Sequence, residues 1–282
     1  MKLLRVGPPG SERPCVMGPG DRVLDLSSLT TDIDGAFLAG GGVDRVRTAL
    51  AEGSLPEAEP YERIGAPVAR PGKVVCIGLN YSDHAEETGA ALPAEPVVFM
   101  KASNTVVGPD DEVLVPRLSV KTDYEVELAV VIGATARYLS SPEEAAGVIA
   151  GYAISNDVSE REFQNERGGQ WDKGKSCETF NPLGPWLVTP DEVGDPQALG
   201  LRLWVNGEQR QNGDTKNQIF GVHHVIWYLS QFMVLDPGDV VNTGTPAGVA
   251  LGRGPEAYLR AGDVVEVEVD GLGRQRQRMG QA

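Results

Sequence analysis

Residues 122–133 read Thr122-Asp123-Tyr124-Glu125-Val126-Glu127-Leu128-Ala129-Val130-Val131-Ile132-Gly133, a run that predicts a buried β-strand interrupted by acidic residues. Alternate side chains of a strand point to opposite faces. One face is therefore apolar, whereas the other carries Asp123, Glu125 and Glu127 and then continues into apolar core. Carboxylates this close repel each other, and a buried carboxylate without a partner is costly. A divalent cation such as Mg²⁺, Mn²⁺ or Ca²⁺ would offset both costs, because these ions prefer oxygen ligands. The alternative from this segment alone is an exposed acidic edge.

The composition is that of an ordinary globular chain. It has 282 residues, of which 41% are apolar and 23% charged, with a formal net charge of −15. This length suits one large domain, or a large domain with a small one. The acidic balance argues against non-specific binding to nucleic acid or to anionic membranes, since both require a basic surface.

The cysteines and the amino-terminus bear on the compartment. Cys15, Cys76 and Cys177 have spacings that fit neither a zinc motif nor an even disulfide framework, which indicates a reducing cytosol. The first residues lack an apolar signal core, and no apolar run approaches the roughly 18 residues that a membrane span needs. We therefore expect a soluble, cytoplasmic protein.

Two parts are expected along the chain, residues 1–70 and residues 71–282. The first contains a strand at 2–6, a hairpin-like stretch at 21–26 and a helix that places Val43, Val46 and Leu50 on one face. A proline-rich segment, residues 52–72, reads as the linker. Strand patterns dominate thereafter, at residues 74–77, 96–100, 125–132, 151–156, 201–205, 240–243 and 264–269.

Helices are few in the second part. Residues 141–144, Ser-Pro-Glu-Glu, carry the start signals of a helix that leads into residues 145–150. A second helix at 222–233 has an apolar stripe, with His223 and His224 in packing or surface roles. Strands without regular helix alternation predict an α+β fold that is mostly β and rolled or barrel-like.

Asp157 is the third carboxylate candidate, because it directly follows the predicted strand at 151–156. Alone it would be a helix cap, since residues 158–161 could begin a helical turn. With Glu125 and Glu127 it completes a three-carboxylate set. Such a set leaves positions open on an octahedral ion for water or substrate. Asp123 is expected to be a structural hydrogen-bond partner and not a ligand.

A histidine and a glutamate follow the predicted strand at 74–77. If residues 83–88 are helical and end at Gly89, His84 and Glu87 lie three apart on one face and can touch. A carboxylate that holds an imidazole raises its basicity and fixes its tautomer, which suits removal of a proton from water. The alternative is a surface histidine–glutamate pair.

Positive and neutral donors for an anionic substrate come from Arg161, Lys175 and Gln164. Charge alone does not distinguish Lys175 from Lys173, and each cation could simply be exposed. Residues 242–249, Asn-Thr-Gly-Thr-Pro-Ala-Gly-Val, predict a strand that ends in a turn. There backbone N–H groups and Thr245 can meet a carboxylate or an oxyanion, although a turn without a ligand is the alternative.

Residues 73–271 resemble the fumarylacetoacetate hydrolase family, specifically its shorter, two-part bacterial members. The motifs that carry the resemblance occur in order: Gly78-Leu79-Asn80-Tyr81 with His84 and Glu87; Asp123-Tyr124-Glu125-Val126-Glu127-Leu128; Asn156-Asp157-Val158-Ser159 with Arg161 and Gln164; Lys175; and Thr243-Gly244-Thr245-Pro246-Ala247-Gly248-Val249. The resemblance implies a mixed β-roll of the family's C-terminal type beside a small N-terminal α+β module, and it implies a homodimer.

The resemblance also implies roles for individual residues. Mg²⁺ or Mn²⁺, with Ca²⁺ able to substitute in crystals, would be held by Glu125, Glu127 and Asp157. His84 with Glu87 would activate water. Lys175, chosen over Lys173, and Gln164 would stabilise an oxyanion. The substrate would be bound by Arg161, Lys175, Thr245 and Gly244.

Two departures from the family pattern matter for the substrate. Fumarylacetoacetate hydrolases proper carry a further metal-binding aspartate where residues 75–78 form an apolar strand, which argues against the eponymous substrate. Ala250 replaces the glycine that usually follows the Gly248-Val249 pair. Residues 170–175 and the Asn206-Gly207 hairpin resemble enzymes that act on 2,4-diketo-3-deoxy sugar acids.

We therefore expect a metal-dependent hydrolase that cleaves the C3–C4 bond of a 2,4-diketo acid, an acylpyruvate or a 2,4-diketo-3-deoxy sugar acid, to pyruvate and a second acid. One alternative is an oxaloacetate-type decarboxylase, or a keto-acid isomerase or dehydratase, on the same site. The other is a metal-stabilised binding protein without turnover.

Overall fold

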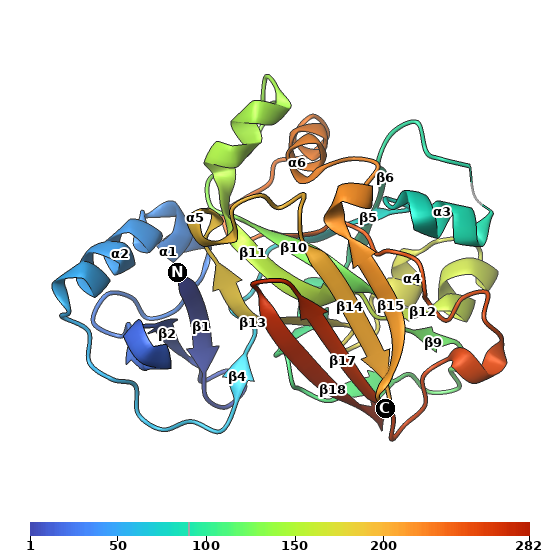
Figure 1. Cartoon of the computed structure of the whole chain (residues 1–282), viewed down its shortest axis with the longest axis horizontal. Helices are drawn as coiled ribbons and strands as arrows, with labels where there is room; N and C mark the ends of the chain where they lie inside the picture. Colours follow the sequence, from blue (N-terminus) through green and yellow to red (C-terminus); the bar gives the residue numbers. More distant parts are fainter. Residues whose placement is uncertain (90) are drawn as a thin grey trace.

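The computed structural model describes residues 1–89 and 91–282, including their side chains except those of His84, Ala85 and Thr88. Strands dominate, and helices lie mainly around the sheets (Figure 1). The predicted α+β, mostly β class is confirmed. In the described part of the chain, no helix has the length and apolar character needed to cross a membrane.

A mixed 11-stranded sheet runs across the molecule in the order β3-β2-β1-β13-β11-β10-β16-β5-β6, with β4 paired to β1 and β7 to β13. Neighbours along this order are antiparallel except β16 and β5, which are parallel. The strands are β1 (Lys2–Val6), β2 (Arg13–Met17), β3 (Val23–Asp25), β4 (Ile64–Gly65), β5 (Val74–Gly78), β6 (Val97–Lys101), β7 (Val106–Val107), β10 (Val126–Ile132), β11 (Ile149–Asn156), β13 (Asn181–Val188) and β16 (Val240–Asn242).

A second sheet has the order β15-β14-β17-β18-β8, and a short ladder joins β12 to β9. Their strands are β8 (Val113–Val115), β9 (Thr122–Asp123), β12 (Ser159–Glu160), β14 (Gly200–Val205), β15 (Glu208–Asp214), β17 (Val264–Val269) and β18 (Gly273–Gln281). Asn206 and Gly207 join β14 to β15 with φ of 52° and 80°. This backbone is typical of an Asn-Gly hairpin turn, so the predicted hairpin is confirmed.

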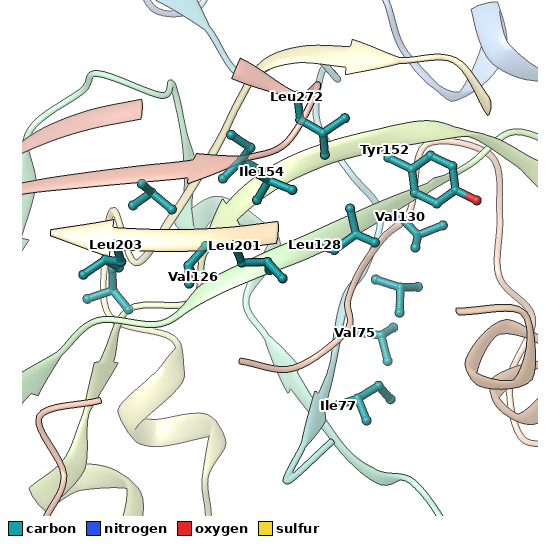
Figure 2. Close-up of a cluster of buried hydrophobic side chains, with 14 of the residues drawn as sticks. Val75, Ile77, Val126, Leu128, Val130, Tyr152, Ile154, Leu201, Leu203 and Leu272 are labelled. Carbon is teal, nitrogen blue, oxygen red and sulfur yellow. The ribbon is translucent and has the colours of Figure 1, made fainter. Parts of the chain in front are cut away.

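The main core lies where the two sheets face each other (Figure 2). Leu128 of β10, Ile154 of β11 and Leu203 of β14 all belong to it. The intervening residues of β10, Ala129 and Val131, are buried in other clusters, so both faces of this strand are covered. The predicted alternation is confirmed, although β10 begins at Val126 and not one residue earlier.

The helices are α1 (Gly35–Ala39), α2 (Gly42–Glu52), α3 (Ser82–Thr88), α4 (Asp172–Lys175), α5 (Pro190–Val193) and α6 (Val222–Ser230). The helix predicted after Ser141 is a 3₁₀ helix, η3 (Pro142–Val148). It ends there because Ile149 pairs with Ile132 and so belongs to β11. Helix α6 buries its predicted stripe but ends three residues before the predicted end at 233.

The amino-terminal strands, drawn in blue in Figure 1, continue the large sheet at one end. The predicted stretch 21–26 contains only the second strand of a hairpin, because β3 pairs with β2. Strand β1 pairs with β13, and Val46 of α2 shares a core cluster with Leu187 of β13. The division of the chain near residue 70 stays a prediction.

Candidate functional site

Three buried carboxylates meet where β10 and β11 pair. Glu127 belongs to β10, Glu125 directly precedes it, and Asp157 directly follows β11. The pairing of Val126 with Asn156 brings the other two side by side, and the Asp157 N–H donates to the Glu125 carbonyl at 2.9 Å. One ligand oxygen from each carboxylate lies within 4.8 Å of the others, and the three side chains are buried.

Two of the carboxylates are held by donors on neighbouring segments. Arg161 Nη2 donates to Glu125 Oε1 at 2.6 Å. The Gly244 N–H donates to Glu127 Oε2 at 2.7 Å. Gly244 has a φ of 98°, and a Cβ there would lie 2.8 Å from the Cβ of Asn80, so glycine is required for this approach. The turn predicted after β16 therefore contacts a carboxylate of the protein itself.

Asp157 lies between two buried lysines. Lys101 donates to Asp157 Oδ1, and Lys175 donates to Asp157 Oδ2 at 2.8 Å and to Glu125 Oε2 at 2.7 Å. Lys101 also donates to the carbonyls of Val158 and Phe180, so its three N–H bonds have acceptors. The ammonium of Lys175 thus bridges two of the three carboxylates.

Electrostatics favour a cation at this centre. Burial, together with the charges of Asp157 and Glu125, raises the pKa of Glu127 well above its ordinary value. With Glu127 ionised, as a bound cation would keep it, four interacting carboxylates among the described residues face three cations and leave one net negative charge: Asp123, Glu125, Glu127 and Asp157 against Lys101, Arg161 and Lys175. An all-oxygen, buried set of this charge fits a hard divalent cation.

Asp123 has a structural role, as expected. Its carboxylate accepts from Arg161 Nε at 2.8 Å and from the N–H groups of Ala250 and Leu251 at 2.7 and 3.0 Å. It thereby fixes both the guanidinium that holds Glu125 and the loop that follows the Gly244 turn.

Helix α3 confirms the helix predicted at residues 83–88, and Gly89 ends it with a φ of 65°. His84 belongs to this helix, but its side chain lies outside the described residues, so its contact with Glu87 stays a prediction. Glu87 accepts a hydrogen bond from the Gly248 N–H at 2.9 Å. This bond connects α3 to the same turn that contacts Glu127.

A pocket of about 670 Å³, counting its open mouth, adjoins the carboxylates. Six of the predicted site residues line it: Glu125, Glu127, Arg161, Gln164, Lys175 and Thr245. Asp157 and Gly244 contact two of these lining residues through the hydrogen bonds described above. The structure therefore assembles most of the predicted residues around one space.

Gln164 and Thr245 are already partly engaged. Gln164 lies in a π-helix, η4 (Glu162–Glu166), a feature frequent at functional sites, and its Oε1 accepts from Arg161 Nη1 at 2.9 Å. The Thr245 hydroxyl donates to the Val126 carbonyl at 2.9 Å and accepts from Gln211 Nε2 at 2.8 Å. A hydroxyl has one proton, so in this arrangement Thr245 can only accept from a ligand.

Several residues at or beside the site were not predicted from the sequence. Lys101 ends β6 and touches Asp157, and a lysine that closes an apolar strand was the available signal. The pocket also has apolar lining residues beyond the predicted set: Ile77, Leu79, Phe99, Trp171 and Leu251. Ile77 and Phe99 lie in apolar strands, where no local pattern separates them from core residues.

Together, the fold and site define an enzyme-type β-roll domain with a buried acidic centre beside a pocket. A family model described as Fumarylacetoacetate (FAA) hydrolase C-terminal matches residues 73–279. The chain belongs to this fumarylacetoacetate hydrolase family, as predicted, and its fold is of that family's type.

Relatives agree with this assignment over the full length. A Burkholderia multivorans protein that carries only the general name of a hydrolase is 52% identical over 278 residues, 98% of each chain. The structure of a fumarylacetoacetate hydrolase from Exiguobacterium antarcticum is 36% identical, with a TM-score of 0.87 over 100% of both chains. That of maleylpyruvate hydrolase from Sphingobium sp. SYK-6, in complex with manganese(II) ion and pyruvate, is 28% identical, with a TM-score of 0.81 over 100% of both chains.

Proposed function

We propose that the protein is a metal-dependent hydrolase that cleaves the C3–C4 bond of a 2,4-diketo acid to pyruvate and a second acid. The observation that carries the proposal is the buried carboxylate set, which opens with Lys175, Arg161 and Gln164 onto one pocket. The related maleylpyruvate hydrolase, whose structure holds manganese(II) and pyruvate, supports this class of metal and product.

The metal would be Mg²⁺ or Mn²⁺, held by Glu125, Glu127 and Asp157, and when bound it would supply Lewis-acid stabilisation of negative charge on a substrate oxygen. The protein contributes the rigidity of this site. Arg161, Lys101 and the Gly244 N–H each hold one carboxylate oxygen, so the ligands are oriented before an ion enters.

Lys175 is a hydrogen-bond donor and not a base in this proposal. Burial alone lowers the pKa of its ammonium, but Asp157 and Glu125 outweigh that effect and raise the pKa above its ordinary value. A permanently charged N–H donor suits an oxyanion, and Gln164 would share that role. The base must then lie elsewhere, and His84, paired with Glu87, is the residue we assign to it.

The bond changes follow from these roles. Water loses a proton to His84 and its oxygen attacks C4, where Lys175 and Gln164 stabilise the resulting alkoxide. When the C3–C4 bond breaks, C4 keeps the new hydroxyl as part of a carboxylic acid. The electron pair of the broken bond leaves with C3, and protonation of C3 completes pyruvate.

A panel of substrates tests the proposal. The loss of diketo-enol absorbance is followed for acylpyruvates and 3-deoxy-2,4-diketo acids, with Mg²⁺ or with EDTA, beside the decarboxylation of oxaloacetate. Hydrolysis that requires the ion supports the proposal. Turnover of oxaloacetate alone would assign the site to decarboxylation, and binding of the ion without any turnover would indicate a binding protein.

Two single histidine variants test the assigned base. Replacement His84→Ala should reduce kcat by roughly 10²- to 10⁴-fold, the usual contribution of a general base, and leave the dissociation constant of Mn²⁺ unchanged. His223→Ala, in helix α6, is the matched control and should leave both quantities unchanged. Full activity of the His84→Ala variant would overturn the assignment.

Two further expectations stay predictions. The homodimer implied by the family would appear in light scattering as twice the 30.0 kDa chain. A cytoplasmic location, with a keto acid as the partner and neither nucleic acid nor a membrane, also awaits direct measurement.

A further inference from the structure

The pocket has apolar lining residues as well as charged ones. Leu79, Phe99, Trp171 and Leu251 line it, and we call these four residues the apolar wall. Phe99 and Trp171 are in edge-to-face contact, with ring centroids 5.4 Å apart and planes at 63°. Such pairs have a preferred geometry, so they form a shaped surface.

Trp171 is seated closely on the backbone of strand β5. A Cβ added at Gly78 would lie 2.5 Å from Trp171 Cζ3 and 3.1 Å from Cη2. No real Cβ approaches an aromatic ring so closely. The indole of Trp171 can therefore lie here only because residue 78 is glycine.

The segment that carries Trp171 is also tied to strand β6, which carries Phe99. Asp172 Oδ1 accepts from the Met100 N–H at 3.0 Å. Ser176 Oγ accepts from the Ala102 N–H at 3.0 Å. Helix α4 is therefore fixed at both ends against β6, which holds the two rings together.

Leu79, one residue of the apolar wall, has a strained backbone conformation. Its φ is 53°, in the left-handed region that a bulky residue rarely adopts. Residues held in this region cluster at ligand sites, where the surrounding structure maintains them. At this position the strained residue is one that lines the pocket.

The wall adjoins the group that acts on the substrate. The Lys175 ammonium lies 4.9 Å from the centroid of the Phe99 ring. In the proposed function, on which this inference rests, Lys175 contacts the oxygen on C4. The part of the substrate beyond C4 then extends from Lys175 along Phe99 and Trp171.

We propose that the apolar wall is an acyl-binding subsite that selects diketo acids whose group beyond C4 is mainly apolar. Alkyl chains can cover the rings of Phe99 and Trp171 and displace water from them. A polyhydroxylated chain would lose its water there, because these side chains offer its hydroxyls only an indole N–H. This ranks acylpyruvates above polyhydroxylated sugar acids as substrates.

The test measures binding, so that it is independent of turnover. Calorimetry with the Mn²⁺-loaded protein gives dissociation constants for 2-oxopentanoate, 2-oxohexanoate and 2-oxoheptanoate, which lack the scissile C3–C4 diketo unit. The constant should fall about fourfold for each added methylene. 2-Oxo-3-deoxygluconate, a hydroxylated match of 2-oxohexanoate, should bind at least tenfold more weakly. Constants that do not change with chain length, or tighter binding of the hydroxylated acid, would overturn the proposal.

Variants locate the effect on the wall. Trp171→Ala should remove most of the chain-length dependence, and Trp171→Phe should restore part of it. Trp204→Ala, on β14 and outside the pocket lining, is the matched control and should keep the full dependence. Leu79→Ala provides the same comparison should Trp171→Ala fail to fold. A series that is unchanged in both Trp171→Ala and Leu79→Ala would refute the subsite, whereas absence of diketo-acid hydrolysis would refute only the proposed function.

Discussion

Lys101→Met should destabilise the protein strongly. The Lys101 side chain is buried, and its ammonium donates to Asp157 and to the carbonyls of Val158 and Phe180 at 3.1 and 2.7 Å. Methionine has a similar volume, so the change removes the charge and its donors with little loss of packing. Removing one partner of a buried ion pair costs about 3–5 kcal/mol. Because Asp157 keeps Lys175, we expect a loss near the lower end of that range.

Urea denaturation in EDTA measures the free energy of unfolding of the wild type and the Lys101→Met variant without a bound ion. Lys121→Met is the matched control, since Lys121 pairs with Glu166 at the surface, where an ion pair contributes little to stability. The dissociation constant of Mn²⁺ should rise about 10- to 100-fold in Lys101→Met, because Asp157 loses the donor that orients it. A loss below about 1 kcal/mol, or an equal loss in the control, would refute this account.

Two further predictions concern Glu127 and Gly248. Because burial, Asp157 and Glu125 raise the pKa of Glu127, its contribution to stability is present below the ordinary carboxyl pKa and is lost as the pH rises through the raised value. In EDTA, the free energy of unfolding of Glu127→Gln minus that of the wild type should therefore be larger at pH 8 than at pH 5. An equal difference at both pH values would contradict this. Gly248→Ala should cost about 2–6 kcal/mol, since φ is 110° and the new Cβ would lie 2.1 Å from the Arg210 carbonyl oxygen. Gly252→Ala is the control, because Gly252 has a φ of 94° but an added Cβ would meet no atom within 4 Å. In the same urea assay it should lose only the stability that the unfavourable backbone conformation costs.

The strands that escaped prediction show where sequence patterns lose information. Strand β18 alternates as any strand does, but its inward positions include Gln275 and Gln277. Burial of these amides is tolerated because each finds backbone carbonyls, as when Gln275 Nε2 donates to Ile154 and Gly184 at 2.9 Å. Such partners come from distant segments, so a glutamine in the sequence gives no sign that it will face a core.

Strand β13 escaped for a different reason. Its sequence contains Pro182 and Pro185, which cannot donate to a ladder and argue against a strand. The structure accommodates them partly by an irregular register, which shifts between Tyr152 and Ile154 on the neighbouring strand β11. Local preference was overridden here by pairing with β11 and β1.

The residues of the site also include some that the sequence indicated and some that it did not. Alternation within one strand and the end of the next marked Glu125, Glu127 and Asp157 as candidates, and the family resemblance assigned them as one set. Lys101 was not selected, because its contact with Asp157 joins residues 56 apart in sequence. The expected contact of Arg161 with the substrate stays a prediction: Arg161 lines the pocket, and its guanidinium also bonds to Asp123 and Glu125. Charge counts along a sequence do not reveal which cations neutralise the protein's own acids.

The pairing of β1 with β13 has a consequence for handling the protein. Strand β13 has β11 on one side and β1 on the other, so residues 1–70 cover one edge of a central strand. An uncovered edge presents free N–H and C=O groups to other chains and promotes aggregation. A truncated gene that begins at the proline-rich segment would therefore yield a self-associating fragment, even though the residues that line the pocket all lie beyond it.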